Sequence, residues 1–192
     1  MIICIEGLTN SGKSSLCDRI KSGTNYCLVN NLLSHNEVTQ RIKRITNPIE
    51  NINKFDEKTE LLLYSTMLSV KAEKVKEIQG NVLLDRFSLS VYSYFTGRYN
   101  MNDTIVKNIV NFSARGIIPD ITFFLDVSLD RIMERKKESP FSRKDIGLED
   151  YYNNLRKKAL EHISDFSNKS FIISCNNMTI DEIFSYVSSI IL

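Results

Sequence analysis

The sequence predicts an α/β fold of three layers, in which a five-stranded parallel sheet is flanked by helices on both faces. Short apolar runs of strand length alternate along the chain with longer segments of helical periodicity. The first apolar run is continuous, as expected for a strand buried on both faces, and it leads directly into a glycine-containing loop. Strands that alternate with helices run parallel, because each helix returns the chain to the starting edge of the sheet.

The N-terminal part of the chain begins with a strand and a helix. Residues 1–5 (MIICI) form a continuous apolar run, and residues 13–21 follow the glycine-containing loop with a helical pattern. Residues 26–30 (YCLVN) have the length of a second, short strand, and residues 37–45 are again helical in pattern.

A long amphipathic helix precedes the third strand. Over residues 58–78 the apolar side chains recur mainly on one helical face, and Gly80 is placed to end the helix. Residues 81–85 (NVLLD) are the third strand, and two helical stretches at 88–98 and 103–115 lead to the fourth.

The C-terminal part continues the alternation. Its elements are a strand at 121–127, a helix to about 137, a charged loop at 138–147, a helix at 148–166, a strand at 170–175 and a helix at 180–191. No internal repeat or linker interrupts this order, so residues 1–192 are expected to form a single domain.

The composition excludes several classes of protein. Hydrophobic residues at 42% and charged residues at 25% are typical of a globular chain and exclude a disordered or collagen-like one. The net charge of +2 gives no electrostatic reason to expect a nucleic-acid or membrane partner. No apolar run approaches the about 20 residues that span a bilayer, and the N-terminus lacks a signal-peptide pattern. The cysteines Cys4, Cys17, Cys27 and Cys175 show no Cys-x-x-Cys spacing, so we expect reduced, buried thiols in a cytoplasmic protein.

A phosphate-binding loop carries the chemistry. Residues 7–14 read Gly-Leu-Thr-Asn-Ser-Gly-Lys-Ser and match G-x-x-x-x-G-K-[ST] between a predicted strand and a predicted helix. Gly7 and Gly12 allow backbone conformations in which successive N–H groups point at phosphate oxygens. We expect Lys13 to bridge the β- and γ-phosphates of ATP and the Ser14 hydroxyl to ligate Mg²⁺. The other loop residues expected at the nucleotide are Asn10, Ser11 and Ser15.

Asp85-Arg86-Phe87 stands at the end of the third predicted strand. Because the C-terminal ends of parallel strands line the ligand crevice, Asp85 is expected near the Mg²⁺. Arg86 is suited to bidentate contact with phosphate, although an arginine here could also be a surface residue at a helix start.

Basic residues gather around residues 138–147, and they include Arg131, Arg135 and Arg143. Taken alone, such a charge run is typical of a solvated helix face. After the fourth strand of a P-loop kinase, however, it predicts a short lid that brings positive charge onto the transferring phosphate. An arginine in that place can contribute about 10³–10⁵ in rate. We therefore predict a P-loop kinase fold with a lid at 138–147, in which Arg135 contacts the nucleotide.

One further motif is interpreted as coincidence. Asn53-Lys54-Phe55-Asp56 matches the N-K-x-D guanine signature, but it precedes the Asp85 strand, and no Asp-x-x-Gly switch follows that strand. Asp56 is expected instead to cap the helix at 58–78.

With these motifs the chain resembles the thymidylate kinase family of P-loop nucleoside-monophosphate kinases over nearly its whole length. The motifs that carry the resemblance are Ile5-Glu6-Gly7-Leu8, Leu84-Asp85-Arg86-Phe87 with Ser90 and Tyr94, Pro119-Asp120-Ile121 and Leu125-Asp126-Val127. The resemblance implies ATP and Mg²⁺ as cofactors, a nucleoside monophosphate as acceptor, in-line phosphoryl transfer and a homodimer packed through helices.

The resemblance also implies roles for single residues. Arg86 would hold the acceptor phosphate, and Arg143 would be the lid arginine. Tyr64 falls where the family places an aromatic ring against the acceptor base, although a core aromatic on an amphipathic helix explains it equally well. Tyr94 matches an aromatic near the acceptor sugar, and Ser90 lies on the same acceptor side.

Two single positions and two short segments depart from the family pattern and predict an altered acceptor pocket. Thr9 stands where the family usually has an acidic residue that reaches the 3′-hydroxyl, and Leu68 where an arginine faces the thymine. Asn30-Asn31-Leu32-Leu33 replaces an Arg-Glu-Pro-Gly segment, and Ser93-Tyr94-Phe95 replaces Ala-Tyr-Gln. Loss of a paired hydrogen-bonding group can cost a site a factor of about 10⁴ in discrimination.

Two other functions remain open at this point. A deoxynucleoside kinase has a related fold and the same Glu-Gly pair before the P-loop, but it usually carries Glu-Arg-Ser in place of Asp85-Arg86-Phe87. A non-catalytic, ATP-binding regulatory protein would retain the donor site and lose the acceptor site, as the altered recognition residues suggest. The sequence does not identify the acceptor.

Overall fold

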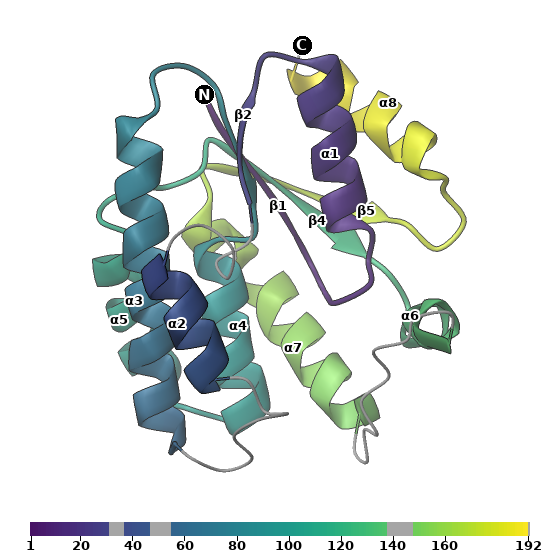
Figure 1. Cartoon of the computed structure of the whole chain (residues 1–192). Coiled ribbons are helices and arrows are strands. Elements are labelled where there is room, and N and C mark those ends of the chain that lie inside the picture. Colours follow the sequence, from purple (N-terminus) through teal and green to yellow (C-terminus); the bar gives the residue numbers. More distant parts are fainter. Residues whose placement is uncertain (31–36, 47–54, 138–147, 192) are drawn as a thin grey trace.

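The computed structural model describes residues 1–30, 37–46, 55–137 and 148–191 (Figure 1). In this part of the chain five strands form one parallel sheet in the order β2-β3-β1-β4-β5, which confirms the predicted fold class. The strands are β1 (Ile2–Gly7), β2 (Cys27–Val29), β3 (Val82–Asp85), β4 (Ile121–Asp126) and β5 (Lys169–Ser174). The central position of β1 gives it a partner on each side and leaves neither edge open.

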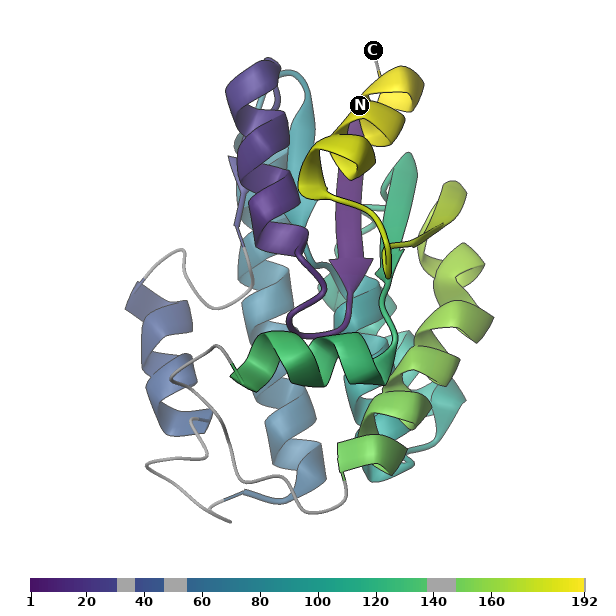
Figure 2. The same cartoon turned by 90° about the vertical axis from the view of Figure 1, so that its right-hand side faces the viewer.

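Helices cover both faces of the sheet, as Figures 1 and 2 show. The described helices are α1 (Lys13–Gly23), α2 (Glu37–Thr46), α3 (Glu57–Glu77), α4 (Ser88–Tyr99), α5 (Asp103–Ser113), α6 (Leu129–Lys137), α7 (Leu148–His162) and α8 (Ile180–Ile191). Helices α1 and α8 lie on one face, and α3, α4, α5 and α7 lie on the other (Figure 1). None of the helices in the described ranges combines the length and apolar character needed to cross a membrane.

The strands divide their side chains between two apolar cores. Ile3 and Ile5 of β1 pack into a cluster with α1 and α8, whereas Cys4 between them packs into a cluster with α3 and α4. This division follows from the alternation of side chains across a strand, and it explains why the β1 run is apolar without interruption.

The register of the sheet brings three segments to one edge. Ile5 of β1 lies opposite Asp85 of β3, and Gly7 lies opposite Leu125 of β4. The phosphate-loop sequence, the end of β3 and the end of β4 therefore meet at the C-terminal edge, where ligands bind in parallel sheets.

The start of α3 and the end of α7 can each be compared with the sequence-based expectation. The predicted cap of α3 is confirmed, because the Asp56 carboxylate accepts a hydrogen bond of 2.7 Å from the Thr59 N–H. The helix predicted at 148–166 ends earlier: α7 stops at His162 and continues as a 3₁₀ turn, η1 (Ile163–Phe166). This tighter turn buries Ile163 and Phe166 against the core before the chain enters β5.

The expectation of buried thiols is correct for Cys4, Cys17 and Cys175 and wrong for Cys27, which is exposed. Cys27 begins β2, a strand of three residues at the edge of the sheet. An edge strand has a neighbour on one side only, so its first side chain is left in contact with solvent.

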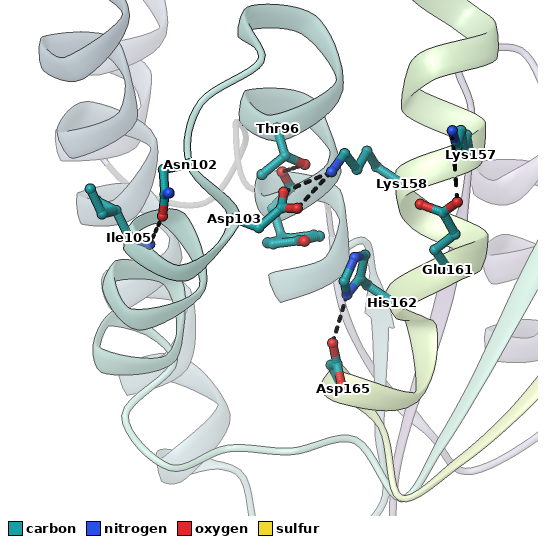
Figure 3. Close-up of polar contacts among 10 residues, drawn as sticks. Thr96, Asn102, Asp103, Ile105, Lys157, Lys158, Glu161, His162 and Asp165 are labelled. Atoms are coloured by element: carbon teal, nitrogen blue, oxygen red, sulfur yellow. Dashed lines mark hydrogen bonds and ion pairs between the residues drawn. The ribbon is translucent and has the colours of Figure 1, made fainter.

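Helix α7 is tied to α5 by a pair of charged side chains (Figure 3). The Lys158 ammonium donates to both carboxylate oxygens of Asp103, at 2.9 and 2.7 Å. This hydrogen bonding lowers the pKa of Asp103 from its ordinary value. The neighbouring Lys157 is more exposed and reaches Glu161 only at 4.0 Å, so it serves as a matched control.

Substitution Lys158→Met is expected to lower the free energy of unfolding near pH 7 by about 0.5–1 kcal/mol, a range already reduced for solvent screening because the Asp103 side chain is 43% exposed. Because the folded pKa of Asp103 lies below its unfolded value, its contribution is present at neutral pH and disappears as pH falls through the folded pKa. Urea unfolding at neutral and acidic pH should therefore show a difference that shrinks in acid. An equal loss in Lys157→Met would contradict this assignment.

Candidate functional site

The phosphate loop between β1 and α1 has the backbone conformation that its glycines allow. Gly7 and Gly12 have φ values of 143° and 98°, and Asn10 between them also has a positive φ of 61°. A Cβ atom at Gly7 would lie 2.7 Å from the Leu125 carbonyl oxygen, so a side chain has no room there. Gly12 is the N-cap of α1 and offers no side-chain cap, which leaves the positive end of the helix free to face an anion.

Lys13 lies inside this loop. Its side chain is buried, and its ammonium donates hydrogen bonds to the Leu8 carbonyl and, at 3.1 Å, to Ser11 Oγ. Burial, and after it the charge of Arg86, hold the pKa of Lys13 well below its usual range. The loop therefore contains a desolvated cation whose two hydrogen bonds go to uncharged oxygens, and phosphate oxygens would be stronger partners.

Ser14 and Asp85 meet at the C-terminal edge of the sheet, as the sequence predicts. Ser14 Oγ donates to Asp85 Oδ2 at 2.9 Å. The other carboxylate oxygen, Oδ1, is buried and has no hydrogen-bond partner among the described residues. A hydroxyl and a carboxylate are oxygen ligands of the kind that Mg²⁺ prefers, and a buried oxygen without a partner is suited to a cation.

Ser14 and Asp85 offer few ligands for a metal site formed by protein side chains alone. Within the described ranges, no group of three or more His, Cys, Asp or Glu side chains could hold a metal ion. Mg²⁺ bound with substrate phosphates usually takes only one or two protein carboxylates, so Ser14 and Asp85 fit that kind of site.

Arg86 turns back toward the phosphate loop. Its backbone is left-handed, with φ 65°, and its guanidinium donates to the Gly7 carbonyl and to Ser90 Oγ, each at 3.0 Å. Arg86 is partly buried and not a surface residue, so the alternative considered from the sequence does not hold.

Glu6 supports this turn from the sheet, a role that the sequence analysis did not predict. Its carboxylate is 1% exposed and accepts hydrogen bonds from the Phe87 N–H at 2.8 Å, the Ser90 N–H at 3.3 Å and the Ser90 hydroxyl. The sequence signal for this role was an acidic residue directly after a continuous apolar run. A carboxylate buried at such a position requires hydrogen-bond partners.

Lys71 supports the same turn from α3 and was also missed. Its ammonium is buried and donates to the carbonyls of Asp85, at 2.8 Å, and Arg86, at 2.7 Å. Burial lowers the pKa of Lys71 to about 8. The signal was a lysine on the apolar stripe of the helix, in line with Leu68 and Val75.

The structure brings Tyr64 and Tyr94 together in an aromatic cluster. Their rings are stacked, with centroids 5.4 Å apart and an angle of 16° between planes. Glu60 accepts hydrogen bonds from the hydroxyls of Tyr94, at 3.2 Å, and Tyr99, at 2.5 Å. Burial raises the pKa of Tyr64 to about 12. Tyr64 also packs against the core, as the core-aromatic interpretation expects, and its contact with an acceptor base stays a prediction.

Arg98 covers this aromatic cluster and was not predicted. Its guanidinium lies 5.2 Å from the centroid of the Tyr94 ring, 5.0 Å from that of Tyr99 and 5.7 Å from that of Tyr151. Attraction between a cation and aromatic rings holds the cluster together.

One face of α4 links the phosphate loop to the aromatic cluster. Ser90, Tyr94 and Arg98 recur every four residues, so they lie on the same face at intervals of about 6 Å along the axis. The first contacts Arg86 and the last two belong to the aromatic cluster. This line of side chains could hold a molecule with a phosphate at one end and a ring at the other.

The lid side of the site is described in part. Arg135 of α6 donates to the Asn10 carbonyl at 3.0 Å, and Figure 2 shows α6 crossing beside the phosphate loop. Arg131 pairs with Glu134 and contacts the Asn176 carbonyl instead. Arg143 and the predicted lid at 138–147 lie outside the described residues.

The remaining predicted residues lie on the loop itself. Thr9 and Ser15 are exposed, whereas Ser11 is buried beside Lys13. Of the departures from the family pattern, Leu68 is fully buried in the apolar core that also contains Phe95. Position 68 therefore presents no polar group to a ligand.

A family profile, two relatives and one solved structure that are similar to this chain share one description. The sequence profile of a family described as thymidylate kinase matches residues 5–186. A thymidylate kinase of Thermosipho melanesiensis is 30% identical over 207 residues, with 100% of this chain and 97% of the relative covered. One of Legionella pneumophila (strain Paris) is 26% identical and covers 99% of this chain and 93% of its own. The solved structure of a thymidylate kinase from Candida albicans, 20% identical, has the same fold with a TM-score of 0.75 over 99% of this chain and 90% of that one.

Proposed function

The chain belongs to the thymidylate kinase family of nucleoside-monophosphate kinases, and on that premise we propose that it transfers the γ-phosphoryl group of ATP to a thymidylate-like monophosphate held in an altered acceptor pocket. The observation that carries this proposal is the convergence of Lys13, Ser14, Asp85 and Arg86 at one edge of the sheet. We further propose that residues 1–192 act as one kinase domain in the cytoplasm.

The donor half of the mechanism follows from the loop. Backbone N–H groups and the positive end of α1 bind the phosphates of ATP, and the Lys13 ammonium exchanges its contacts with Leu8 and Ser11 for phosphate oxygens. The residues that would hold Mg²⁺ are Ser14 and Asp85, and the ion would neutralise charge on the phosphate oxygens. Arg135 lies beside the same loop and contacts the nucleotide from α6.

The acceptor half begins at Arg86, whose guanidinium reaches the phosphate loop and binds the acceptor phosphate near the γ-phosphate. Alignment of the two phosphates contributes to the rate because little covalent chemistry is required of the protein. Arg143 is proposed as the lid arginine by the family resemblance.

The acceptor pocket is proposed to recognise its base differently from the family pattern. Tyr64 and Tyr94 supply aromatic surface for a base and sugar, and Ser90 lies between them and the phosphate site. The apolar Leu68 supports the altered pocket, because it is buried in the core where the family has an arginine facing the thymine. Thr9 likewise lacks the carboxylate that would reach the 3′-hydroxyl.

The decisive test is a panel of acceptors assayed by ADP release. It contains thymidylate, the other common nucleoside monophosphates and the corresponding nucleosides. We expect one or more monophosphates to be turned over and the nucleosides to be inert, because Arg86 needs a phosphate to bind. Turnover confined to nucleosides would establish the deoxynucleoside kinase alternative. Failure of every acceptor, with ATP still bound tightly, would establish the regulatory alternative.

A homodimer is proposed as well, since the family resemblance implies one. The surface formed by α3 and α5 supports it: a groove there is lined in part by Leu62, Ile109 and Phe112, and the Leu62 and Phe112 side chains are 58% and 86% exposed. Large exposed apolar side chains that lie together are typical of interfaces.

A further inference from the structure

Lys71 is a buried charge that the donor and acceptor halves of the proposed mechanism do not use. It is 2% exposed, and in the described structure both of its hydrogen bonds go to main-chain carbonyls, those of Asp85 and Arg86. Taking an ammonium out of water is strongly unfavourable unless its partners compensate. Because the buried Leu68 and Val75 lie one turn to either side of Lys71 on α3, an apolar side chain would satisfy the packing without that cost.

The two carbonyls belong to an unusual turn. Arg86 has a φ of 65°, a left-handed conformation that is unfavourable for a residue with a side chain and persists only when its surroundings hold it. Lys71 is placed to hold it, since its ammonium donates to the carbonyls of the two peptide groups that flank the Arg86 Cα, at 2.8 and 2.7 Å.

Two buried side chains of opposite charge hold the turn by hydrogen bonds to its main chain. From β1, the Glu6 carboxylate accepts from the N–H groups of Phe87 and Ser90. From α3, the Lys71 ammonium donates to the carbonyls that precede them. With the main chain of the turn held by these two groups, the Arg86 guanidinium donates to the Gly7 carbonyl in the phosphate loop, 3.0 Å away.

We propose that Lys71 is a positioning residue for phosphoryl transfer, which fixes the Asp85–Arg86 turn so that Arg86 reaches the phosphates. The inference rests on the role of Arg86 in the proposed function. It assigns no contact between Lys71 and the substrates. Its effect is on alignment, and a misplacement of about 1 Å at a reacting group can reduce the rate about 10²-fold.

The first measurement is the steady-state kinetics of Lys71→Met, which keeps most of the length of the side chain and removes its donors. The expected result is a kcat about 10²-fold lower with the KM for ATP close to that of the wild type. Lys71→Gln keeps a neutral donor on a side chain shorter than that of lysine. Its kcat should lie between those of the wild type and Lys71→Met. The control is Lys74→Met on the exposed side of the same helix, which should behave as wild type. A loss of thermal stability in Lys71→Met with kcat retained would show a merely structural role and overturn the proposal.

The second measurement is a double-mutant cycle with Arg86→Ala. If Lys71 acts through Arg86, then Lys71→Met should cost little further activity once Arg86 has been replaced. Fully additive losses in the cycle would mean that Lys71 acts elsewhere, which would overturn the inference. Should Lys71→Met fail to fold, Lys71→Gln takes its place in the same cycle.

A third measurement separates this inference from the proposed function. If the wild-type protein turns over no acceptor, the proposed function fails, but the nuclear magnetic resonance signal of the Arg86 Nε–H still reports the turn. That signal is expected to shift in Lys71→Met and to remain in place in Lys74→Met. An unshifted signal in Lys71→Met would overturn the positioning role independently of catalysis.

Discussion

Substitution Lys13→Met is expected to reduce phosphoryl transfer by about 10²–10³-fold or more, because it removes a buried cation aimed at the charge of the transferring phosphate. Methionine has a similar length and no charge, so the shape of the loop is kept. The measurement is ADP release with the best acceptor of the panel. Lys21→Met, in the exposed last turn of the same helix, is the control and should retain full activity.

Unfolding cannot account for that loss. Burial lowers the pKa of Lys13, which means that the fold favours its charged form less than the unfolded chain does. The Leu8 carbonyl keeps a second donor, the Ser11 N–H at 3.3 Å, when the ammonium is removed. The melting temperature of Lys13→Met should therefore be equal to or above that of the wild type. Full activity in this variant would contradict the kinase assignment.

Substitution Gly97→Ala should have the largest effect on stability. A Cβ atom at position 97 of α4 would lie 2.9 Å from both Cα and N of Leu155 in α7, and 3.0 Å from the carbonyl carbon of Asn154. These are backbone atoms of a helix, so the two helices must separate. We expect a loss of about 2–3 kcal/mol in the free energy of unfolding. In an isolated helix the same replacement of glycine by alanine would instead be stabilising by about 1 kcal/mol.

The matched control is Gly23→Ala at the end of α1. Its Cβ atom would meet only the ring of the partly buried Phe184, at 3.2 Å, and a single side chain can shift by a few tenths of an ångström more easily than a helix backbone. Urea unfolding should show a change within about 0.5 kcal/mol for this variant. Similar losses in both variants would show that the close approach of α4 and α7 is not the cause. Because α4 carries Ser90, Tyr94 and Arg98, Gly97→Ala should also lower activity in the folded fraction.

The elements of this fold were predictable because their signals are local. A continuous apolar run such as 1–5, a capping Asp56 and a glycine-lysine loop each act within a few residues, and the structure places a strand, a helix start and the phosphate loop there. The exact ends were less predictable. The last turn of the helix predicted at 148–166 became 3₁₀, and Cys27 came to the surface, since both depend on what packs beside them.

The sequence by itself determined the class of chemistry, because the phosphate loop is a single segment whose spacing carries its own geometry. It also predicted that Asp85 and Arg86 lie beside the phosphates, and the family resemblance predicted that Tyr64 and Tyr94 lie beside the acceptor. Only the tertiary structure decided how Arg86 is held. Glu6 is 81 residues from Phe87 in sequence, and Lys71 is 15 residues from Arg86 on another element. Parallel pairing of β1 with β3 and the packing of α3 beneath them bring these groups together. A hydrogen bond depends on position in space, and spacing along the chain does not reveal a contact formed across a sheet.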